Sequence, residues 1–477
     1  MKKTKIVCTI GPASETTEVL EQLIKAGMNV MRLNFSHGDH EEHLAKVKTL
    51  RAINEKLGTN IAFMLDTKGP EIRTGSFGTD QKTKMDFTKG DKITLTTRDV
   101  EGSKELLSVT YTGLPNDVEV GGHILIDDGL VDLLIDEIDG TEIKCTFQNS
   151  ATLKGKRGVN VPGAKLQLNA MTEKDKSDLR FAVENGFDFV AASFIRKPQD
   201  VIEMREYLNS VGKNNIKIIS KIENQEGLDN FDEILKVTDG VMVARGDLGV
   251  EIPEELVPAA QKMMIKKTVE AGKTVITATQ MLESMTHQPL PTRAEASDVA
   301  NAIYDRTSAI MLSGECAQGD YPVECVKTMV KIANRVEPEI HYWKRFSNNE
   351  DLDLSNDVTK IAYSACVTAK NMNADAIVTY THTGDSVRKL AGLGAGCPIL
   401  AITDNKRTFH QLALAWNVTP IYVEAGATIE ETIDKGIEKL KNKEILEKGD
   451  VVVLSGGAKT FSSGMTKKVI GGILRID

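Results

Sequence analysis

Residues 216–247 read IKIISKIENQEGLDNFDEILKVTDGVMVARGD. Two runs rich in β-branched residues, Ile216–Ile222 and Gly240–Ala244, flank a segment with helical periodicity over Gly227–Lys236. A short apolar strand, an amphipathic helix and a second short strand form the repeating unit of a parallel β-sheet. This stretch therefore predicts an α/β protein.

The same alternation of strand and helix recurs along most of the chain. Thr172 with Asp175, and Thr292 with Glu295, form capping boxes at two helix starts, where a side-chain oxygen accepts an unpaired backbone N–H. Eight strands, each followed by a helix, predict a (β/α)8 TIM barrel. The expected strands are Lys5–Ile10, Asn29–Leu33, Ile61–Leu65, Phe189–Phe194, Ile216–Ile222, Gly240–Ala244, Thr274–Ala278 and Ala309–Leu312. The expected helices are Thr17–Ala26, Glu41–Leu57, Glu173–Glu184, Gln199–Ser210, Gly227–Lys236, Glu254–Ala271, Arg293–Tyr304 and Pro322–Arg335.

The carboxyl ends of the expected strands are strongly polar, and this is where such barrels carry their chemistry. A single Asp or Ser after a strand is more often a helix cap or a turn residue than a functional group. The set is more informative than its members, because barrel closure would bring all of them around one mouth. These residues are Asn34, Ser36, Asp66, Thr67, Lys221, Glu223, Arg245, Asp247, Thr279, Gln280, Ser313 and Glu315.

Residues 69–168 separate the third and fourth expected strands and show little helical periodicity. Short alternating runs such as Lys92–Thr96 and Glu142–Thr146 are punctuated by Gly and Asp-Gly turns, which is typical of a small all-β domain. The insertion leaves directly from the strand that ends at Asp66. We therefore favour a lid that excludes water from the site, with a passive surface domain as the alternative.

A third unit follows the polar, linker-like stretch over 347–356. Four further strands alternate with helices, which predicts a separate open α/β sheet. We expect a catalytic barrel over residues 1–68 plus 169–343, an inserted β-barrel lid domain over 69–168, and a C-terminal α/β regulatory domain over 344–477. The expected strands of the last domain are Ala376–Tyr380, Ile399–Ile402, Pro420–Val423 and Val451–Leu454.

Two turns of the C-terminal domain, Thr381–Ser386 and Ser455–Gly464, are rich in glycine and small hydroxyl residues. Free backbone N–H groups and hydroxyls at a helix start suit a phosphate. Ordinary turn chemistry explains the same residues equally well.

Composition excludes several classes of function. The chain has 477 residues, with 59 Lys and Arg against 68 Asp and Glu, so its formal net charge is −9. No basic run suits nucleic acid, and no apolar run approaches the roughly 18 residues of a membrane span. The first residues do not show the pattern expected of a signal sequence, so we expect no export, and the six cysteines form no CxxC pair. We therefore expect a cytoplasmic protein with no nucleic-acid or membrane partner.

Lys221, Glu223 and Asp247 give the sharpest chemical signal. Positions 221 and 223 point to the same side of a strand, so both side chains would enter the mouth together. Carboxylates from neighbouring strands, here Glu223 and Asp247, suit Mg²⁺, which prefers hard oxygen ligands. A buried Lys-Glu ion pair is the alternative, but it leaves one carboxylate over.

Cations and oxygen donors gather near the same rim. Arg32, Arg73 and Lys221 would offset charge on a moving phosphoryl group, which predicts a phosphorylated small acid as substrate. A second, oxygen-rich cluster carries one formal charge and suits a monovalent cation better than a divalent one. Its members are Asn34, Ser36, Asp66 and the Thr67 carbonyl.

Over nearly its whole length, the chain resembles the pyruvate kinases. Seven blocks in the same order carry the resemblance, and together they are highly specific. The blocks cover residues 29–38 (NVMRLNFSHG), 65–74 (LDTKGPEIRT), 218–227 (IISKIENQEG), 242–249 (MVARGDLG), 277–284 (TATQMLES), 291–295 (PTRAE) and 311–315 (MLSGE).

This resemblance implies transfer of the phosphoryl group of phosphoenolpyruvate to ADP, giving pyruvate and ATP. By the same resemblance, Lys221 stabilises the transferring phosphoryl group and Arg32 grips it. Glu223 and Asp247 hold Mg²⁺ or Mn²⁺. The oxygen-rich cluster matches the family's K⁺ site, and Glu71 matches the form associated with K⁺ dependence.

The resemblance also implies roles for residues around the substrate. Backbone N–H groups at Gly246 and Asp247 would bind the substrate carboxylate. Thr279 lies near the face of the enolate that gains a proton, which we expect to arrive through water with help from Ser313 and Glu315. The residues implied for the nucleotide are Asn34, His37, Arg73 and Arg157.

Some positions depart from the family pattern or concern regulation. Arg157 stands where members often carry lysine, and Gln318 replaces a lysine of the rim. Members are typically homotetramers and often bind a phosphorylated activator, so we expect a phosphosugar or nucleotide activator here. Asp385 would repel a phosphate unless a cation compensates it. The positions implied for the activator are Thr381, Thr383, Gly384, Ser386 and Lys459.

Two other functions stay open on the sequence alone. A catalytically silent homologue could sense sugar phosphates, although the intact Lys221, Glu223 and Asp247 argue against it. Another barrel enzyme of enolates, such as an aldolase or a phosphoenolpyruvate mutase, would share the metal carboxylates. Those enzymes lack the inserted β domain and the terminal α/β domain.

Overall fold

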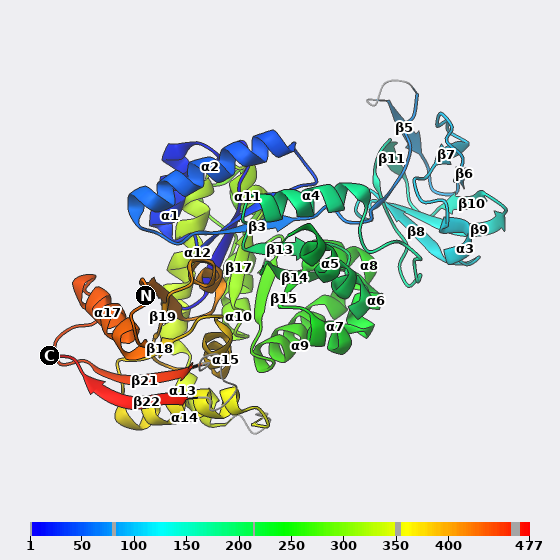
Figure 1. Cartoon of the computed structure of the whole chain (residues 1–477). Helices are drawn as coiled ribbons and strands as arrows, with labels where there is room; N and C mark the ends of the chain where they lie inside the picture. The colour runs from blue at the N-terminus through cyan, green and yellow to red at the C-terminus, as the bar shows by residue number, and fades with distance from the viewer. Residues whose placement is uncertain (1, 79–82, 213–214, 349–353, 459–467) are drawn as a thin grey trace.

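A closed barrel of eight parallel strands forms the centre of the molecule, in the order β1-β17-β16-β15-β14-β13-β3-β2 (Figure 1). The computed structural model describes residues 2–78, 83–212, 215–348, 354–458 and 468–477. The predicted (β/α)8 barrel is confirmed. Its strands are almost wholly buried, because helices cover the outside of the sheet. They are β1 (Lys5–Thr9), β2 (Val30–Asn34), β3 (Ala62–Asp66), β13 (Phe189–Ala192), β14 (Lys217–Ile222), β15 (Gly240–Ala244), β16 (Thr274–Ala278) and β17 (Ala309–Leu312).

Helices surround the barrel, and both predicted capping boxes are present at Thr172 and Thr292. The outer layer comprises α1 (Thr17–Ala26), α2 (His40–Leu57), α4 (Glu173–Glu184), α5 (Pro198–Val211), α6 (Gln225–Asp229), α7 (Phe231–Val237), α8 (Arg245–Glu251), α9 (Val257–Glu270), α10 (Arg293–Tyr304), α11 (Gly314–Ala317), α12 (Pro322–Val336) and α13 (Tyr342–Ser347). Short 3-10 turns accompany them at η1 (Glu254–Leu256), η2 (Glu283–Thr286) and η3 (Glu337–Glu339).

Several element bounds differ from those expected from the sequence, and two of these differences have a clear structural cause. The single helix expected over Gly227–Lys236 is two helices, α6 and α7, which meet at Asn230. The Asn230 side chain donates to the Arg196 carbonyl at 2.9 Å, so a contact with the preceding loop breaks the helix. Strand β13 ends at Ala192 rather than Phe194, because Phe194 has a left-handed φ of 57°.

Apolar side chains fill the barrel interior and join it to the C-terminal part of the chain. The interior cluster includes Val7, Met242 and Met311, and it continues into Ala413 and Leu414 of η4 (Leu412–Leu414). The C-terminal part therefore packs against the amino-terminal ends of the barrel strands. The carboxyl ends of the barrel strands, which carry the polar side chains, face the inserted strands instead.

The insertion between β3 and β13 is an almost entirely β structure, as predicted, and Figure 1 shows it projecting from the barrel. One seven-stranded sheet has the order β4-β12-β8-β9-β10-β6-β7, and β5 pairs with β11. Phe87 and Phe147 stack in its own hydrophobic core, with ring centroids 4.2 Å apart. Its elements are β4 (Ile72–Arg73), β5 (Lys84–Phe87), β6 (Lys92–Thr96), β7 (Leu106–Ser108), α3 (Leu114–Asp117), β8 (His123–Ile126), β9 (Val131–Asp139), β10 (Glu142–Phe147), β11 (Ala151–Lys154) and β12 (Gly158–Asn160).

The C-terminal part is an open α/β sheet, as predicted, on the side of the barrel away from the insertion (Figure 1). Its strand order is β20-β19-β18-β21-β22. The sequence did not predict β22, which runs antiparallel to β21 and contains Gly471 and Gly472, residues that are rare in strands. Its elements are α14 (Asp357–Met372), β18 (Ala376–Tyr380), α15 (Asp385–Leu393), β19 (Ile399–Thr403), α16 (Lys406–Gln411), β20 (Val418–Tyr422), α17 (Ile429–Asn442), β21 (Val451–Ala458) and β22 (Lys468–Arg475). Within the described residues, no helix is both long and apolar enough to cross a membrane.

Candidate active site

Barrel closure brings the polar strand ends together, as the sequence analysis predicts. Asn34 at the end of β2 lies directly opposite Asp66 at the end of β3 in the parallel register. Strand β14 carries Lys221 and pairs with β15, whose end leads directly into Arg245, Gly246 and Asp247 of α8. The candidate site is therefore built on rigid strands, which hold side chains more firmly than loops do.

Lys221 is the centre of the candidate site. Its Nζ lies 2.8 Å from Glu223 Oε1, 3.3 Å from Asp66 Oδ1 and 2.8 Å from Ser193 Oγ. The side chain is 12% exposed. Burial by itself would lower the pKa of this ammonium group, but the carboxylates of Asp66, Glu223 and Asp247 raise it well above its ordinary value. Lys221 is therefore a fixed positive charge that faces the mouth.

Arg32 provides a second fixed cation beside Lys221. Its Nε donates to Asp66 Oδ2 at 2.7 Å, and its Nη1 donates to Thr9 Oγ1 at 2.7 Å. Burial would raise the pKa of Asp66, but Arg32 and Lys221 hold it below its ordinary value. Within the described residues, Arg32 Nη2 makes no hydrogen bond to protein, so one edge of the guanidinium remains available to an anion.

Glu223 and Asp247 supply the two carboxylates predicted for a divalent cation. Glu223 is 1% exposed, and its Oε2 accepts the Phe194 N–H at 2.5 Å. Burial and the nearby Asp247 raise the pKa of Glu223, although Lys221 opposes this effect. The Asp247 carboxylate has no hydrogen-bond or ion-pair partner in the described part of the chain. Among the described residues, no three acidic, His or Cys side chains are placed so that they could hold a metal ion together, so protein alone would supply only part of a coordination shell.

That donor set fits Mg²⁺ or Mn²⁺. Mg²⁺ in phosphoryl-transfer sites is typically bound by one or two carboxylates, with substrate oxygens and water completing the shell. Glu223 and Asp247 lie just beyond the ends of the adjacent strands β14 and β15, and within the described residues Asp247 is unpaired. The pair is thus suited to an ion that arrives with its substrate.

The four predicted ligands of a monovalent cation lie at the ends of β2 and β3. Asn34 Oδ1 accepts the Ser36 N–H at 3.1 Å, which folds the turn after β2 back toward its end. Asp66 carries the single formal charge of the group, and Thr67 follows it with its carbonyl bound by Ser193 Oγ at 2.6 Å. Oxygen donors with one negative charge fit a weakly hydrated monovalent cation.

Thr279 is held in a strained conformation beside Gly246. Thr279 and Gln280 have φ values of 64° and 52°, and a left-handed β-branched residue is a genuine outlier. Thr279 Oγ1 accepts the Gly246 N–H at 2.8 Å. The Gly246 N–H predicted to bind a substrate carboxylate is therefore engaged with Thr279.

Arg245 holds this strained turn in place. Its Nε donates to the Ala278 carbonyl at 3.1 Å and its Nη2 to the Thr279 carbonyl at 2.6 Å. Nη1 forms an ion pair with Asp298 at 2.7 Å. One side chain thus links the start of α8, the end of β16 and helix α10.

Ser313 lies at the end of β17, on the same rim as the strand end that carries Thr279. Its backbone N–H donates to Glu315 Oε2 at 2.7 Å, and Glu315 Oε1 accepts the Leu282 N–H at 3.1 Å. Burial raises the pKa of Glu315 even though these backbone donors oppose it. Because both carboxylate oxygens hold backbone groups, Glu315 acts as a structural clamp in this structure rather than as a partner of Thr279. Gln318 caps the end of α11, with its N–H on the Gly314 carbonyl at 3.0 Å.

The residues predicted for the nucleotide lie where the inserted strands meet the barrel. Arg73 Nε donates to Glu71 Oε2 at 2.8 Å, and its Nη1 donates to the Lys156 carbonyl at 3.0 Å. Arg157 Nη1 lies 3.4 Å from Asp127 Oδ1, and its buried Nε has no hydrogen-bond partner in the part of the chain that the structure describes. His37 lies in the turn after β2, with its N–H on the Asn34 carbonyl at 3.3 Å.

A cavity of about 120 Å³ that opens to solvent lies between the inserted strands and the barrel mouth. Asp247 and Asn224 line it from the barrel, and Asp128 lines it from the insertion. Across it, Asn160 Nδ2 donates to Glu251 Oε1 at 2.8 Å. The insertion therefore roofs the site, and Asn160 fastens it to the barrel through a contact that the sequence analysis did not identify.

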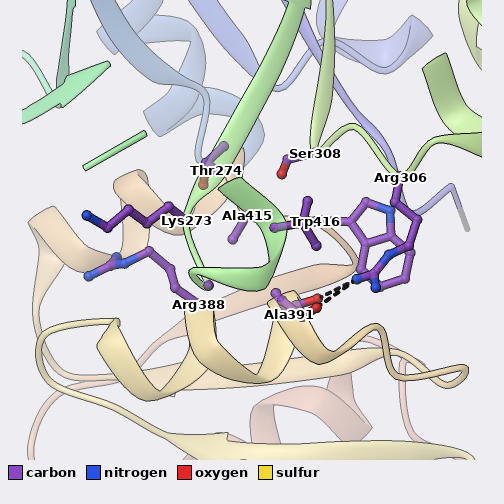
Figure 2. Close-up of a pocket in the computed structure, with 11 residues that line it drawn as sticks. Lys273, Thr274, Arg306, Ser308, Arg388, Ala391, Ala415 and Trp416 are labelled. Atoms are coloured by element: carbon purple, nitrogen blue, oxygen red, sulfur yellow. Dashed lines mark hydrogen bonds between the residues drawn. The ribbon is translucent and has the colours of Figure 1, made fainter. Parts of the chain in front are cut away.

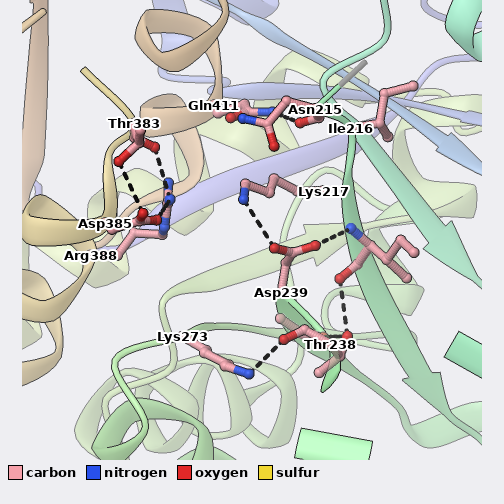
Figure 3. A network of polar contacts seen from close by, with 12 residues as sticks. Asn215, Ile216, Lys217, Thr238, Asp239, Lys273, Thr383, Asp385, Arg388 and Gln411 are labelled. Atoms are coloured by element: carbon pink, nitrogen blue, oxygen red, sulfur yellow. Dashed lines mark hydrogen bonds and ion pairs between the residues drawn. The ribbon is translucent and has the colours of Figure 1, made fainter. Parts of the chain in front are cut away.

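The turn predicted to bind a phosphorylated activator is satisfied internally. Thr381 Oγ1 accepts the Gly384 N–H at 2.9 Å and the Ser386 hydroxyl at 3.4 Å, while Thr383 Oγ1 donates to Asp385 at 3.0 Å. Burial would raise the pKa of Asp385, but its ion pair with Arg388 lowers it (Figure 3). Arg388 is thus the cation that compensates Asp385. Lys459 lies outside the described residues.

Two polar side chains join the activator turn's domain to the base of the barrel. Gln411 Nε2 donates to the Asn215 carbonyl at 2.6 Å (Figure 3). The same nitrogen donates to the Asp188 carbonyl at 3.3 Å. Arg306 Nη2 donates to the carbonyls of Ala391 and Gly392 at the end of α15, at 3.2 and 3.0 Å (Figure 2). Helix α15 begins in the activator turn, so the contact made by Arg306 ties the far end of that helix to the barrel.

Sequence reasoning missed three residues that complete the candidate site. Ser193 was overlooked because the expected β13 ran on to Phe194, although a polar residue at a strand end was the signal used elsewhere. Arg245 was noted only as a strand-end residue, and nothing in its local sequence reveals that it holds Thr279. Glu251 lies on a helix whose contact with Asn160 depends on the position of the insertion.

Comparison with known proteins shows the family to which the chain belongs. A family model described as the barrel domain of pyruvate kinase matches residues 1–326, and one described as the alpha/beta domain of pyruvate kinase matches residues 359–469. The pyruvate kinase of Clostridium acetobutylicum is 48% identical over 467 residues, 98% of this chain and 98% of that protein. The pyruvate kinase of Staphylococcus saprophyticus is 48% identical over 468 residues, 98% of this chain and 79% of that protein. The chain belongs to the pyruvate kinase family.

Proposed function

We propose that this enzyme transfers the phosphoryl group of phosphoenolpyruvate to ADP, forming pyruvate and ATP. One observation carries the proposal: the Lys221 ammonium, 2.8 Å from Glu223 and 3.3 Å from Asp66, stands beside Arg32 at the barrel mouth. Phosphoryl transfer requires positioning and electrostatic stabilisation more than covalent chemistry. A fixed pair of cations at the barrel mouth is suited to both.

Arg32 and Lys221 would divide the work on the phosphoryl group. Arg32 is anchored through Nε and Nη1, so its free Nη2 can bind a phosphoryl oxygen without rearrangement of the side chain. Lys221 faces the position at which negative charge develops as the group moves. Prearranged charges of this kind typically contribute several kcal/mol to a transition state, because they cost no reorganisation during the reaction.

We propose that Glu223 and Asp247 hold Mg²⁺ or Mn²⁺, and that Asn34, Ser36, Asp66 and the Thr67 carbonyl hold K⁺. When bound, the divalent ion would supply positive charge to the oxygens of the substrate. The unpaired Asp247 carboxylate supports the first assignment. The register pairing of Asn34 with Asp66 supports the second.

Residues on β16 and β17 would complete the reaction after phosphoryl transfer. The enolate must gain a proton at its methylene carbon, and Thr279 and Ser313 stand at neighbouring strand ends on that rim. The Thr279 hydroxyl donates to the Ala278 carbonyl at 2.6 Å, so it would orient a water molecule rather than release its own proton. The substrate carboxylate would bind the backbone at Gly246 and Asp247 once the Gly246 N–H leaves Thr279.

The nucleotide would enter under the inserted strands, beside Asn34, His37, Arg73 and Arg157. The buried, unpartnered Nε of Arg157 supports this placement, because an anion could satisfy it. We further propose that a phosphosugar or nucleotide activates the enzyme at Thr381, Thr383, Gly384 and Ser386, that the enzyme is a homotetramer, and that it acts in the cytoplasm.

The test is pyruvate formation from phosphoenolpyruvate with ADP and Mg²⁺, measured in KCl, in NaCl and after addition of a chelator. We expect an absolute requirement for ADP, faster turnover in K⁺ than in Na⁺, and loss of activity on chelation that Mg²⁺ or Mn²⁺ restores. Folded protein that forms no pyruvate under any of these conditions would refute the proposal and favour a silent sensor.

A further inference from the structure

Ser193 stands between the proposed K⁺ site and Lys221. It follows directly after β13 and is 3% exposed. Its hydroxyl lies 2.6 Å from the Thr67 carbonyl oxygen, 2.8 Å from Lys221 Nζ and 3.3 Å from Asp66 Oδ1. Its backbone N–H donates to Thr67 Oγ1 at 3.1 Å. The side chain is therefore held from several directions at once.

The chemistry of the partners fixes the direction of both short hydrogen bonds. A protonated lysine can only donate, so the Ser193 oxygen accepts from Lys221. A carbonyl can only accept, so the single Ser193 proton points to Thr67. The result is a directed chain from the Lys221 ammonium through the Ser193 hydroxyl to the Thr67 carbonyl. Hydrogen bonds in such a chain polarise one another in a buried site.

The Thr67 carbonyl belongs to the set of oxygens proposed for K⁺. A carbonyl oxygen has two lone pairs, and Ser193 occupies one of them. A cation bound through the other lone pair would share the Thr67 carbonyl oxygen with the Ser193 proton. Asp66 Oδ1 is the alternative acceptor for that proton. The fit of the cation would thus influence where the Ser193 proton points and how firmly Ser193 holds Lys221.

We infer that Ser193 is a positioning residue that couples the monovalent cation site to Lys221; this inference rests on the proposed function. It touches neither the transferred phosphoryl group nor the divalent ion. Its role is to place the Lys221 Nζ correctly only when the Thr67 carbonyl carries a cation of the right size. Through this contact, the choice between K⁺ and Na⁺ would affect the position of Lys221 at the reacting centre.

The experiment compares Ser193→Ala with Ser220→Ala in the full-length enzyme. Ser220 is a matched control because it is fully buried, precedes Lys221 on β14, and donates a single hydrogen bond to Thr238 Oγ1 at 2.9 Å. Loss of a hydrogen bond to a charged group typically changes a rate by about 10- to 100-fold. We expect that decrease in kcat for Ser193→Ala, with little change in KM for phosphoenolpyruvate, and neither effect for Ser220→Ala.

Two cation readouts separate coupling from a general loss of structure. The ratio of kcat in K⁺ to kcat in Na⁺ should fall toward one in Ser193→Ala and stay at the wild-type value in Ser220→Ala. The rise in melting temperature caused by KCl, relative to tetramethylammonium chloride, should shrink in Ser193→Ala even without substrate. Ser193→Cys, with a weaker hydrogen-bonding group of similar size, should give intermediate values.

An unchanged K⁺/Na⁺ ratio in an active Ser193→Ala enzyme would overturn the inference and leave the proposed function intact. An equal fall of the ratio in Ser220→Ala would also overturn it, because the effect would then be general to the barrel. Wild-type protein that forms no pyruvate would overturn the proposed function, and the inference with it. If Ser193→Ala does not fold, the same comparison with Ser193→Cys decides the matter.

Discussion

Replacement of Arg245 by methionine should separate the fold of this enzyme from its turnover. The Arg245 side chain is 12% exposed and donates to two consecutive carbonyls, those of Ala278 and Thr279. These bonds hold Thr279 and Gln280 in left-handed conformations with φ of 64° and 52°. Arg245→Met keeps most of the apolar stem but removes every donor. The turn would then relax toward an ordinary backbone conformation and move the Thr279 hydroxyl away from Gly246.

The structure sets the size of the effect. A hydrogen bond from a charged donor contributes about 1.5–3 kcal/mol, and two carbonyls lose such a donor. Relaxation of the strained turn returns about 1–3 kcal/mol for each of the two left-handed residues, so the gain and the loss nearly cancel and the free energy of unfolding should change by less than about 2 kcal/mol. Asp298 is 34% exposed, so its lost ion pair adds little. A displacement of about 1 Å at a reacting group typically costs about 100-fold in rate.

The assay combines steady-state kinetics of pyruvate formation with urea denaturation. We expect kcat to fall about 100-fold in Arg245→Met, with little change in KM for phosphoenolpyruvate. Lys262→Met is the control, because it removes an exposed ion pair with Asp305 and should cost less than about 1 kcal/mol with no change in kcat. A kcat for Arg245→Met within a factor of about three of wild type would refute the claim that the strained turn positions Thr279.

Three further predictions concern other parts of the molecule. Burial raises the pKa of Asp188 from 3.8 to about 7, so the folded state holds this proton more tightly than the unfolded state. The free energy of unfolding should therefore fall by up to about 4 kcal/mol as pH rises from about 4 to about 7. This fall should be missing in Asp188→Asn. Denaturant titrations that give the same pH dependence for both proteins would contradict the prediction. Asn160→Ala removes the hydrogen bond to Glu251 and should increase deuterium uptake at the edge of the cavity. The control Gln148→Ala removes a hydrogen bond within the insertion and should leave deuterium uptake at that edge unchanged. Identical uptake in Asn160→Ala and wild type would refute the idea that Asn160 fastens the insertion to the barrel. Arg306 has a φ of 71°, so Arg306→Gly relieves backbone strain but loses two hydrogen bonds to the end of α15 and the cation–π contact with Trp416. We expect a net destabilisation of about 1–3 kcal/mol and a shift in tryptophan emission, and a more stable Arg306→Gly protein would show that strain outweighs the contact.

Most of the barrel could be predicted from the sequence because its strands are buried on both faces. The bounds of β15, β16 and β17 agree with the expected ranges residue for residue, since each is a short apolar run that ends at a polar residue. Helices with a side-chain cap, such as those after Thr172 and Thr292, were also placed correctly. In these segments, local preference and tertiary packing favour the same structure.

The errors occur where a distant contact overrides the local pattern. Asn230 lies within a helical pattern, but its bond to the Arg196 carbonyl divides the helix. Phe194 continues a run of strand-forming residues, but its N–H is bound by Glu223 and its φ is left-handed. Neither partner is close enough in sequence for a local pattern to reveal it.

In the candidate site, too, local sequence predicted some features and distant contacts determined the others. Strand-end position was sufficient to predict that Lys221, Glu223, Asp66 and Asp247 lie at one mouth of the barrel, because barrel geometry fixes where strand ends lie. It was not sufficient to show which oxygens were already engaged. The Glu315 carboxylate and the Gly246 N–H are both occupied by neighbours, which only the coordinates reveal.

The most direct test of the account follows the phosphorus atom itself. Phosphorus NMR of a mixture of phosphoenolpyruvate, ADP, Mg²⁺ and K⁺ should show the phosphoenolpyruvate signal replaced by the γ-phosphate of ATP, with one pyruvate formed for each ATP. Lys217→Met is the control for Lys221→Met, because Lys217 lies at the opposite end of the same strand and pairs with Asp239 at 3.1 Å. We expect that Lys221→Met abolishes this transfer and that Lys217→Met preserves it. Transfer at the wild-type rate in folded Lys221→Met would contradict the central role of that ammonium group.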